Sequence, residues 1–149
     1  VTDEEMARRV SDHKKRRPAD WITAEVPRHL SDALPQLFIK ADVILIDCLT
    51  VYVATLLYDY RECLPRDIED RAGEEMREIL RLLRQSGKSV ILVTNEVGSG
   101  IVPPDAVSRL FRDVAGRVNR LAAAEADEVY LSVSGLAVEI KSRAVTKGE

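Results

Sequence analysis

The stretch VTNEVGSGIVP, residues 93–103, joins an apolar run typical of a β-strand to a run typical of an amphipathic helix. It carries one acid, Glu96, and two glycines, Gly98 and Gly100. We expect these glycines to supply the positive φ that a tight loop requires. In α/β proteins, loops at the carboxyl ends of parallel strands hold phosphate and metal chemistry. The stretch therefore predicts an α/β fold with a functional loop at this place.

Patterns on both sides of this loop alternate between strand and helix. Residues 43–46 and 90–93 are continuous apolar runs, typical of parallel strands that are covered on both faces. Helical periodicity predicts helices over 49–58, 66–85 and 105–124. The second of these helices should bury Ile68, Ala72, Met76, Ile79, Leu80 and Leu83. The third should bury Val107, Leu110, Phe111, Val114, Val118 and Leu121.

The two ends of the chain add shorter elements. A helix should begin at a Thr2 and Glu5 capping box and stop before Pro18. A short strand over 21–25 and a helix over 28–37 follow in the prediction, with Pro27 at the start of that helix. Strands over 129–133 and 138–140 are expected to form a hairpin through Ser134 and Gly135.

The Gly-Lys-Ser run at 87–89 resembles part of a phosphate-binding loop but lies in the wrong context. It follows a predicted helix and opens a predicted strand, whereas the phosphate loop follows a strand and opens a helix. The first glycine of that motif would fall at position 82, which is Leu82. We interpret Gly87 as a helix stop.

Length and composition point to a single domain over residues 1–149. The net charge is −3, from 22 basic and 25 acidic residues, so no global field recruits nucleic acid or an anionic membrane. The apolar runs are too short to span a bilayer, and the N-terminus shows no apolar signal core. Cys48 and Cys63 form no metal-type pair and suit a reducing cytoplasm.

Five segments together resemble one enzyme family. They are RVSDHKKRRP (9–18), IDCLT (46–50), VTNEVGSGIVP (93–103), FRDVAGRVN (111–119) and ADEVYLSVSG (126–135). The resemblance is to the bifunctional adenosylcobinamide kinase and adenosylcobinamide-phosphate guanylyltransferases of cobalamin biosynthesis. It implies an α/β fold of the P-loop NTPase (RecA-like) type, a mainly parallel sheet with flanking helices. It also implies GTP or ATP and adenosylcobinamide or its phosphate as substrates, Mg²⁺ as cofactor, and a homo-oligomer, a trimer with its site near subunit contacts.

The resemblance assigns a role to His13, which by itself reads as an ordinary surface histidine on a helix. The family segment that matches residues 9–18 contains a histidine that becomes covalently guanylylated, so His13 is expected to be the nucleophile. Lys14, Lys15, Arg16 and Arg17 are expected to bind the nucleotide and to keep the imidazole neutral. A nucleic-acid patch is the other interpretation of this basic cluster, but no aromatic residues are interleaved for stacking.

Three acids complete the expected site. Glu25 matches the family position that contacts the guanine nucleotide. Asp47 follows the apolar run 43–46 and matches a Walker B acid, which would bind nucleotide and Mg²⁺. Glu96 follows the next strand and is expected to be an active-site acid facing the same crevice. Arg112, Asp113, Arg117 and Asn119 also match the family pattern without an assigned role.

A member of this family is expected to begin with a strand, a Gly-Lys-Ser phosphate loop and a helix, about thirty residues in all. Residues 1–149 contain no such unit, so we expect an N-terminally truncated domain, either a fragment or a natural truncation. Loss of that strand should expose a pairing edge in the sheet. The alternative function is therefore a catalytically inactive nucleotide-binding or oligomerisation module.

Overall fold

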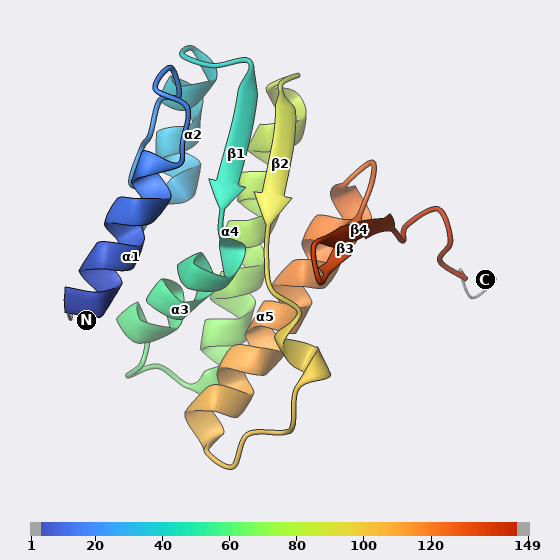
Figure 1. Cartoon of the computed structure of the whole chain (residues 1–149). Helices are drawn as coiled ribbons and strands as arrows, with labels where there is room; N and C mark the ends of the chain where they lie inside the picture. The colour runs from blue at the N-terminus through green and yellow to red at the C-terminus, as the bar shows by residue number, and fades with distance from the viewer. Residues whose placement is uncertain (1–3, 146–149) are drawn as a thin grey trace.

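The computed structural model describes residues 4–145 of the chain, apart from the side chains of Met6 and His13. The fold is α/β, with helices flanking a parallel pair of strands and a separate antiparallel hairpin near the C-terminus (Figure 1). In chain order the elements are α1 (Glu4–Lys15), α2 (Leu30–Phe38), β1 (Val43–Asp47), α3 (Leu49–Asp59), α4 (Pro65–Gln85), β2 (Ser89–Val93), the 3₁₀ turn η1 (Val97–Ser99), α5 (Ala106–Glu125), β3 (Tyr130–Val133) and β4 (Leu136–Glu139).

The parallel sheet brings the carboxyl ends of β1 and β2 together. Its register pairs Val43 with Ser89 at one end and Asp47 with Val93 at the other. Because both strands end at the same edge, the loops that follow them start side by side. This edge is where the sequence predicted a functional loop.

The prediction that both strands are covered on both faces is wrong. Ile44 is buried, and Ile46, Val90 and Leu92 pack against the core. The alternate residues are exposed: Val43, Leu45, Ile91 and Val93. Successive strand side chains point to opposite faces, and the helices of the core cover only one face in the described part of the chain. A continuous apolar run indicates a strand but does not determine how many layers cover it.

The core is built around α4, and its buried face is the predicted one. The buried residues of this helix are Ile68, Ala72, Met76, Ile79, Leu80 and Leu83. They pack with Leu30 and Leu34 of α2, with α3, and with Val114 and Val118 of α5. The face of α5 that was predicted to be buried is confirmed only in part, because Val107 is 73% exposed. Val107 lies in the first turn of α5.

The glycine predicted to end the long helix is confirmed. Gly87 follows α4 with a φ of 64°, in the left-handed region where glycine costs little. Lys88 donates to Asp42 at 2.7 Å and Ser89 begins β2, so the Gly-Lys-Ser run is a helix stop. The helix predicted over 28–37 is α2, but Pro27 does not begin it, since the helix starts three residues later at Leu30 and continues through Pro35.

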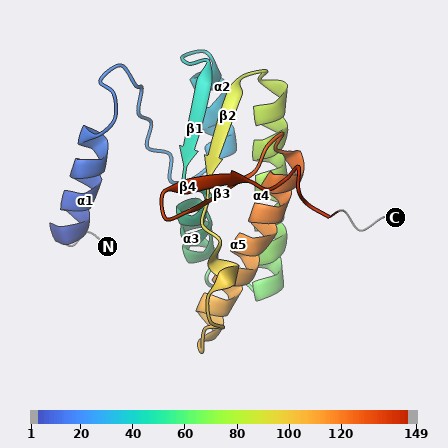
Figure 2. The same ribbon diagram turned by 45° about the vertical axis from the view of Figure 1, so that its right-hand side comes forward.

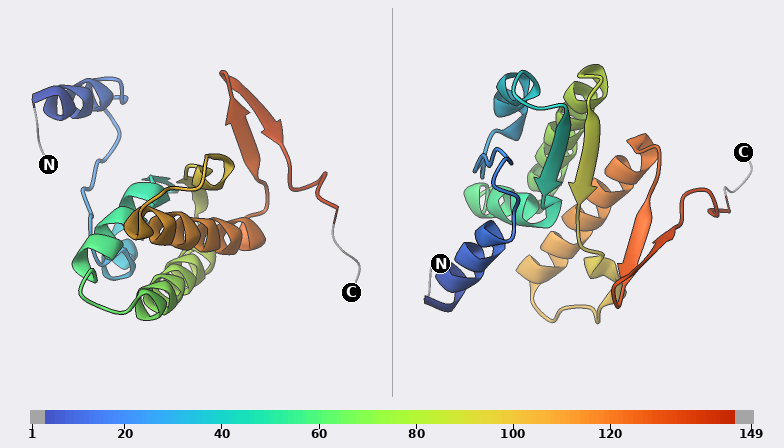
Figure 3. Two further views of the ribbon diagram at one scale, coloured as in Figure 1. Left: turned by 90° about the horizontal axis from the view of Figure 1, so that it is seen from below. Right: turned by 45° about the horizontal axis from the view of Figure 1, so that its top comes forward.

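Two segments lie apart from the helices that cover the sheet, as Figures 2 and 3 show. The first is α1, and the second is the β3–β4 hairpin, which confirms the predicted hairpin with Ser134 and Gly135 at its turn. α1 ends at Lys15, and Thr2 of the predicted capping box lies outside the described residues. The strand predicted over 21–25 is wrong: these residues form no strand and pair with none in the described chain.

Candidate functional site at the carboxyl edge of the sheet

Asp47 at the end of β1 and Glu96 in the loop after β2 lie at the carboxyl edge of the parallel sheet. Asp47 is the last residue of β1, and its partner in register, Val93, is the last residue of β2. Both carboxylates are on exposed residues. The fold therefore brings an acid and an acid-bearing loop to one edge, as the strand patterns predicted.

Side chains from α3 and α5 hold the start of the loop after β2. The Thr50 hydroxyl accepts a 2.8 Å hydrogen bond from the Asn95 backbone N–H and lies 3.2 Å from the Thr94 hydroxyl. Thr94 Oγ1 donates to Asn119 Oδ1 at 2.6 Å, and Asn119 Nδ2 donates to the Asn95 carbonyl at 3.1 Å. Thr50 is buried, so its hydroxyl needs these partners. Thr50 of α3 and Asn119 of α5 thus hold the start of this loop against two helices.

The part of the loop around η1 is held by Glu96 and Arg112. Glu96 Oε1 accepts from the Gly98 N–H at 3.1 Å and so caps the short turn η1. Arg112 Nη2 donates to the Gly98 carbonyl at 2.6 Å. The expectation that Gly98 and Gly100 supply positive φ is wrong, since the described glycines with positive φ are Gly87 and Gly135. Gly98 instead allows close approach, because a Cβ there would lie 2.7 Å from Glu96 Oε1.

The basic cluster lies at the end of α1 and contacts the connection that follows. The Lys14 ammonium forms an ion pair with Glu25, and Arg17 donates to the Thr23 hydroxyl at 3.2 Å. The hydrogen bond from Lys14 lowers the pKa of the Glu25 carboxyl below its ordinary value, and the nearby charges of Lys14 and Arg17 act in the same direction. Lys15 lies 3.5 Å from Asp12, and Arg16 is exposed. Lys14, Lys15 and Arg16 thus form an exposed basic patch with the half-buried Arg17, and the Lys14 ion pair joins Glu25 to it. The sixth predicted nucleotide-binding residue, Asp47, lies at the end of β1.

The structure does not bring this patch to the strand edge within one chain. His13 lies in the last turn of α1, and its side chain is outside the described part of the structure. Figure 2 shows α1 standing clear of the ends of β1 and β2. The predicted site residues therefore fall into two groups, His13 to Arg17 with Glu25, and Asp47 with Glu96.

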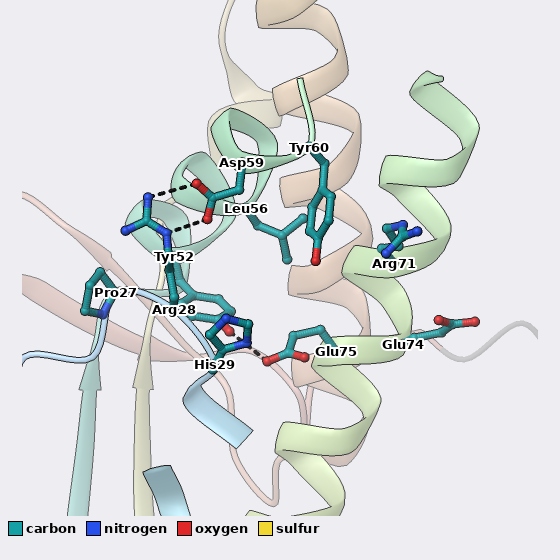
Figure 4. A pocket seen from close by; sticks show the side chains of 10 residues that line it. All are labelled: Pro27, Arg28, His29, Tyr52, Leu56, Asp59, Tyr60, Arg71, Glu74 and Glu75. Atoms are coloured by element: carbon teal, nitrogen blue, oxygen red, sulfur yellow. Dashed lines mark hydrogen bonds and ion pairs between the residues drawn. The ribbon is translucent and has the colours of Figure 1, made fainter. Parts of the chain in front are cut away.

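A polar cleft of about 200 Å³ lies elsewhere, between the start of α2, α3 and the N-terminal half of α4 (Figure 4). Arg28 forms a two-pronged ion pair with Asp59 at 2.6 and 2.8 Å. Tyr52 donates to Glu75 at 2.7 Å and accepts from the Leu30 N–H at 3.2 Å. Burial raises the pKa of the Tyr52 hydroxyl. None of the predicted site residues lines this cleft, and these contacts join α2 to α3 and α4.

Asp47 has the chemistry that Mg²⁺ requires, although the described side chains form no cluster of three or more His, Cys, Asp or Glu suited to a metal ion. Mg²⁺ is commonly held by one or two carboxylates together with substrate phosphates and water. The exposed carboxylate of Asp47, at the open edge of the sheet, fits that pattern.

Within residues 4–145, every helix is too short or too polar to pass through a lipid bilayer.

Sequence reasoning did not find Thr50 and Thr94, and it left Asn119 without a role. A usable signal is the spacing of Arg112 and Asn119. Seven residues apart, they share one side of α5, and both donate to backbone carbonyls of the same loop. Arg117, which matched the same segment, instead pairs with Glu69 of α4 at 2.8 Å.

Fold and site define an α/β protein that places Asp47 and the Glu96 loop at the carboxyl edge of a parallel sheet, the usual place for nucleotide chemistry. A family model described as cobinamide kinase / cobinamide phosphate guanyltransferase matches residues 1–140. The chain belongs to this family of enzymes.

Similar proteins from three organisms agree with that assignment. The bifunctional adenosylcobalamin biosynthesis protein CobU of Salmonella typhimurium is 43% identical over 147 residues, covering 95% of this chain and 81% of the relative. The protein of the same name from Escherichia coli is 40% identical, with the same coverage of both chains. The bifunctional adenosylcobalamin biosynthesis protein CobP of Pseudomonas aeruginosa is 35% identical over 139 residues, covering 93% of this chain and 76% of the relative.

Proposed function

We propose that this protein phosphorylates adenosylcobinamide and then transfers GMP from GTP to adenosylcobinamide phosphate, with His13 as the residue that carries GMP. The observation that carries the proposal is the family match over residues 1–140, which includes the segment around His13. The similarity to bifunctional adenosylcobalamin biosynthesis proteins supports both activities and a role in cobalamin biosynthesis.

The guanylyl transfer divides into two substitutions at phosphorus. A neutral imidazole nitrogen of His13 attacks the α-phosphorus of GTP, a P–N bond forms, and the bond to the β-phosphate bridging oxygen breaks to release pyrophosphate. An oxygen of adenosylcobinamide phosphate then attacks the same phosphorus, and the P–N bond breaks to regenerate the histidine. Splitting one difficult transfer in this way is the ordinary advantage of a covalent intermediate.

The basic patch supplies the charge that this chemistry requires. Lys14, Lys15, Arg16 and Arg17 would neutralise the polyphosphate, and their positive charge disfavours protonation of a neighbouring imidazole. Glu25 is engaged by Lys14 in the chain alone. Binding of guanine by Glu25 would therefore exchange an ammonium partner for the N1 and N2 donors of the base.

The strand edge would serve the phosphate groups. Asp47 would hold Mg²⁺, which when bound neutralises phosphate charge, and Glu96 would act as the active-site acid in the adjoining loop. The separation of α1 from this edge favours a site completed between copies of the chain, and the family resemblance implies that three copies assemble. The exposed apolar residues Val43, Leu45, Ile91 and Val93 offer a surface that such contacts could cover.

The decisive experiment is covalent labelling of the full chain with GTP carrying a radioactive α-phosphate, in the presence of Mg²⁺. We expect acid-labile label on the wild-type chain and none on His13→Ala, because in the proposed reaction the imidazole of His13 is the nitrogen that attacks the α-phosphorus. His29→Ala is the matched control, since His29 is the other histidine of the chain, and it should keep its label. A wild-type chain without label, or a labelled His13→Ala, would overturn the proposed transfer.

The alternative, a binding or oligomerisation module without turnover, is favoured by the same separation of α1 from the strand edge. Titration of the chain with GTP separates the two functions. An inactive module should show negligible Mg²⁺-dependent binding, whereas the transferase should bind GTP more tightly when Mg²⁺ is present.

A further inference from the structure

The hydrogen bonds at the start of the loop after β2 form a closed ring around the backbone of Asn95. The ring runs from the Asn95 N–H to Thr50, then to Thr94, then to Asn119, and back to the Asn95 carbonyl. Its members come from α3, the end of β2 and α5. The Asn95 N–H is therefore held by Thr50 of α3, and the Asn95 carbonyl is held by Asn119 of α5.

The direction of every bond in this ring follows from the donors and acceptors available. An amide oxygen only accepts, so the Thr94 hydroxyl proton is committed to Asn119 Oδ1 at 2.6 Å. The 3.2 Å contact between Thr50 and Thr94 must then carry the Thr50 proton, with Thr94 accepting. Thr50 in turn accepts from the Asn95 N–H. Every hydroxyl donates once and accepts once, and no proton position remains open.

The same reasoning determines the orientation of the Asn119 carboxamide. With its oxygen and nitrogen exchanged, its oxygen would face the Asn95 carbonyl, and two acceptors would meet at 3.1 Å. Arg112, two turns earlier on α5, donates to the carbonyl of Gly98, which follows Asn95 and Glu96 in the loop. The segment between these anchors presents the exposed residues Asn95 and Glu96 at the carboxyl edge, beside the end of β1.

We propose that Thr94 and Asn119 are positioning residues for the transferase reaction, acting through the backbone of Asn95 to hold the Asn95–Glu96 segment in place before substrate binds. This proposal rests on the proposed function, in which Glu96 is an active-site acid. A group whose backbone is already held needs no reorganisation when the reaction begins, and such preorganisation acts on turnover more than on substrate binding. The ring is therefore expected to affect kcat and to leave KM for GTP nearly unchanged.

The test compares Thr94→Val with Thr94→Ser in the full chain. Valine keeps the shape of threonine but removes the hydroxyl that links Thr50 to Asn119, whereas serine keeps that hydroxyl. We expect Thr94→Val to lower kcat for guanylyl transfer by about tenfold to a hundredfold, the scale of a small misplacement at a reacting centre, with KM for GTP within about twofold. Thr94→Ser should recover kcat to within about threefold of wild type. Thr55→Val is the matched control, because the Thr55 hydroxyl bonds only the Val51 carbonyl within its own helix, and it should keep wild-type kcat.

A second measurement reads the ring directly and does not depend on activity. Hydrogen exchange of the Asn95 amide in the ligand-free chain should be slowed in wild type and in Thr94→Ser, and at least about tenfold faster in Thr94→Val. Asn119→Asp offers a second variant, since its carboxylate can accept from Thr94 but sets a negative oxygen against the Asn95 carbonyl. It should behave like Thr94→Val in both measurements.

The outcomes separate the proposal from the function on which it rests. If wild type transfers GMP and Thr94→Val does so equally fast, the positioning role is overturned while the proposed function stands. If KM rises in place of a fall in kcat, the ring serves binding and the proposal is also overturned. If wild type transfers nothing, the proposed function fails, and equal exchange of the Asn95 amide in wild type and Thr94→Val would overturn the ring as well.

Discussion

The helical body (α2 to α5 with β1 and β2) and the α1 arm (α1 with the connection 16–29) differ in how deeply their residues are buried. Every buried residue in the described chain lies between Leu30 and Ala122, in α2 to α5 and β1. The described residues of α1 and of the connection 16–29 include none that is buried. The arm nevertheless carries His13 and its basic patch. Burial gives most of the free energy of folding, so a residue can be essential for transfer here while contributing little to the fold.

The largest expected effect is on stability and lies in the body. Ile79→Ala should lower the free energy of unfolding by about 2–5 kcal/mol, because Ile79 is 0% exposed and its removal leaves a cavity. Val107→Ala is the matched control, since Val107 is 73% exposed, and it should change stability by about 0.5 kcal/mol or less. Urea denaturation followed by circular dichroism measures both. Equal losses in the two variants would contradict the division between buried and exposed apolar residues.

A smaller effect is expected where α2 joins the body. Tyr52→Phe removes a hydroxyl that donates to Glu75 and accepts from the Leu30 N–H, and should cost about 1–2 kcal/mol. Urea denaturation at neutral pH measures this loss. Tyr60→Phe, at a less buried tyrosine of the same cleft, should cost less.

The same hydroxyl predicts a dependence on alkaline pH. Burial raises the folded-state pKa of Tyr52 above its ordinary value of 10.0. The protonated hydroxyl therefore makes its whole contribution to the free energy of unfolding below the pKa that Tyr52 has in the unfolded chain. This contribution is lost as the pH rises through the pKa of Tyr52 in the folded chain. The stability difference between wild type and Tyr52→Phe should narrow above about pH 10. A difference that stays constant or widens there would refute this account.

The smallest effect on stability is expected in the arm. Lys14→Ala removes the partner of Glu25, and we expect the pKa of Glu25 to rise towards its ordinary value of 4.5 with no measurable change in Tm. In wild type the depressed pKa means that the pair contributes above the unfolded pKa, and that this contribution is lost as the pH falls through the folded pKa. Carboxyl NMR titration of Glu25 measures the shift. Lys15→Ala is the control and should leave the pKa of Glu25 closer to its wild-type value, because Lys15 pairs with Asp12.

The parts of the fold that follow from local periodicity were predictable. The six residues predicted to face the core on α4 are the ones buried there, because helix geometry and the sequence pattern alone select that face. The parallel strands, the hairpin and the Gly87 stop followed from equally local signals. The strand over 21–25 failed because a strand needs a partner, and periodicity does not reveal whether one is present.

The candidate site was predictable only where single residues follow a strand or match a motif. Asp47 and Glu96 could be placed at the carboxyl edge from the strand patterns, whereas the roles of His13 and Glu25 came from the family resemblance and stay predictions. The ring around Asn95 was not predictable, although Thr50, Thr94 and Asn119 lie in segments that match the family, because they are widely spaced along the chain and no local pattern shows that they meet. Only packing of α3 and α5 against the end of β2 makes them neighbours.

By itself, then, the order of residues determined which segments become helices and parallel strands, which face of α4 is buried, and to which family the chain belongs. These properties depend on residues that are close together along the chain, or on sequence motifs that can be recognised without the structure. Tertiary structure alone decided that one face of the sheet is exposed, that α1 lies away from the strand ends, and that three polar side chains close a ring on Asn95. Those properties depend on distances between elements, which a linear pattern does not contain.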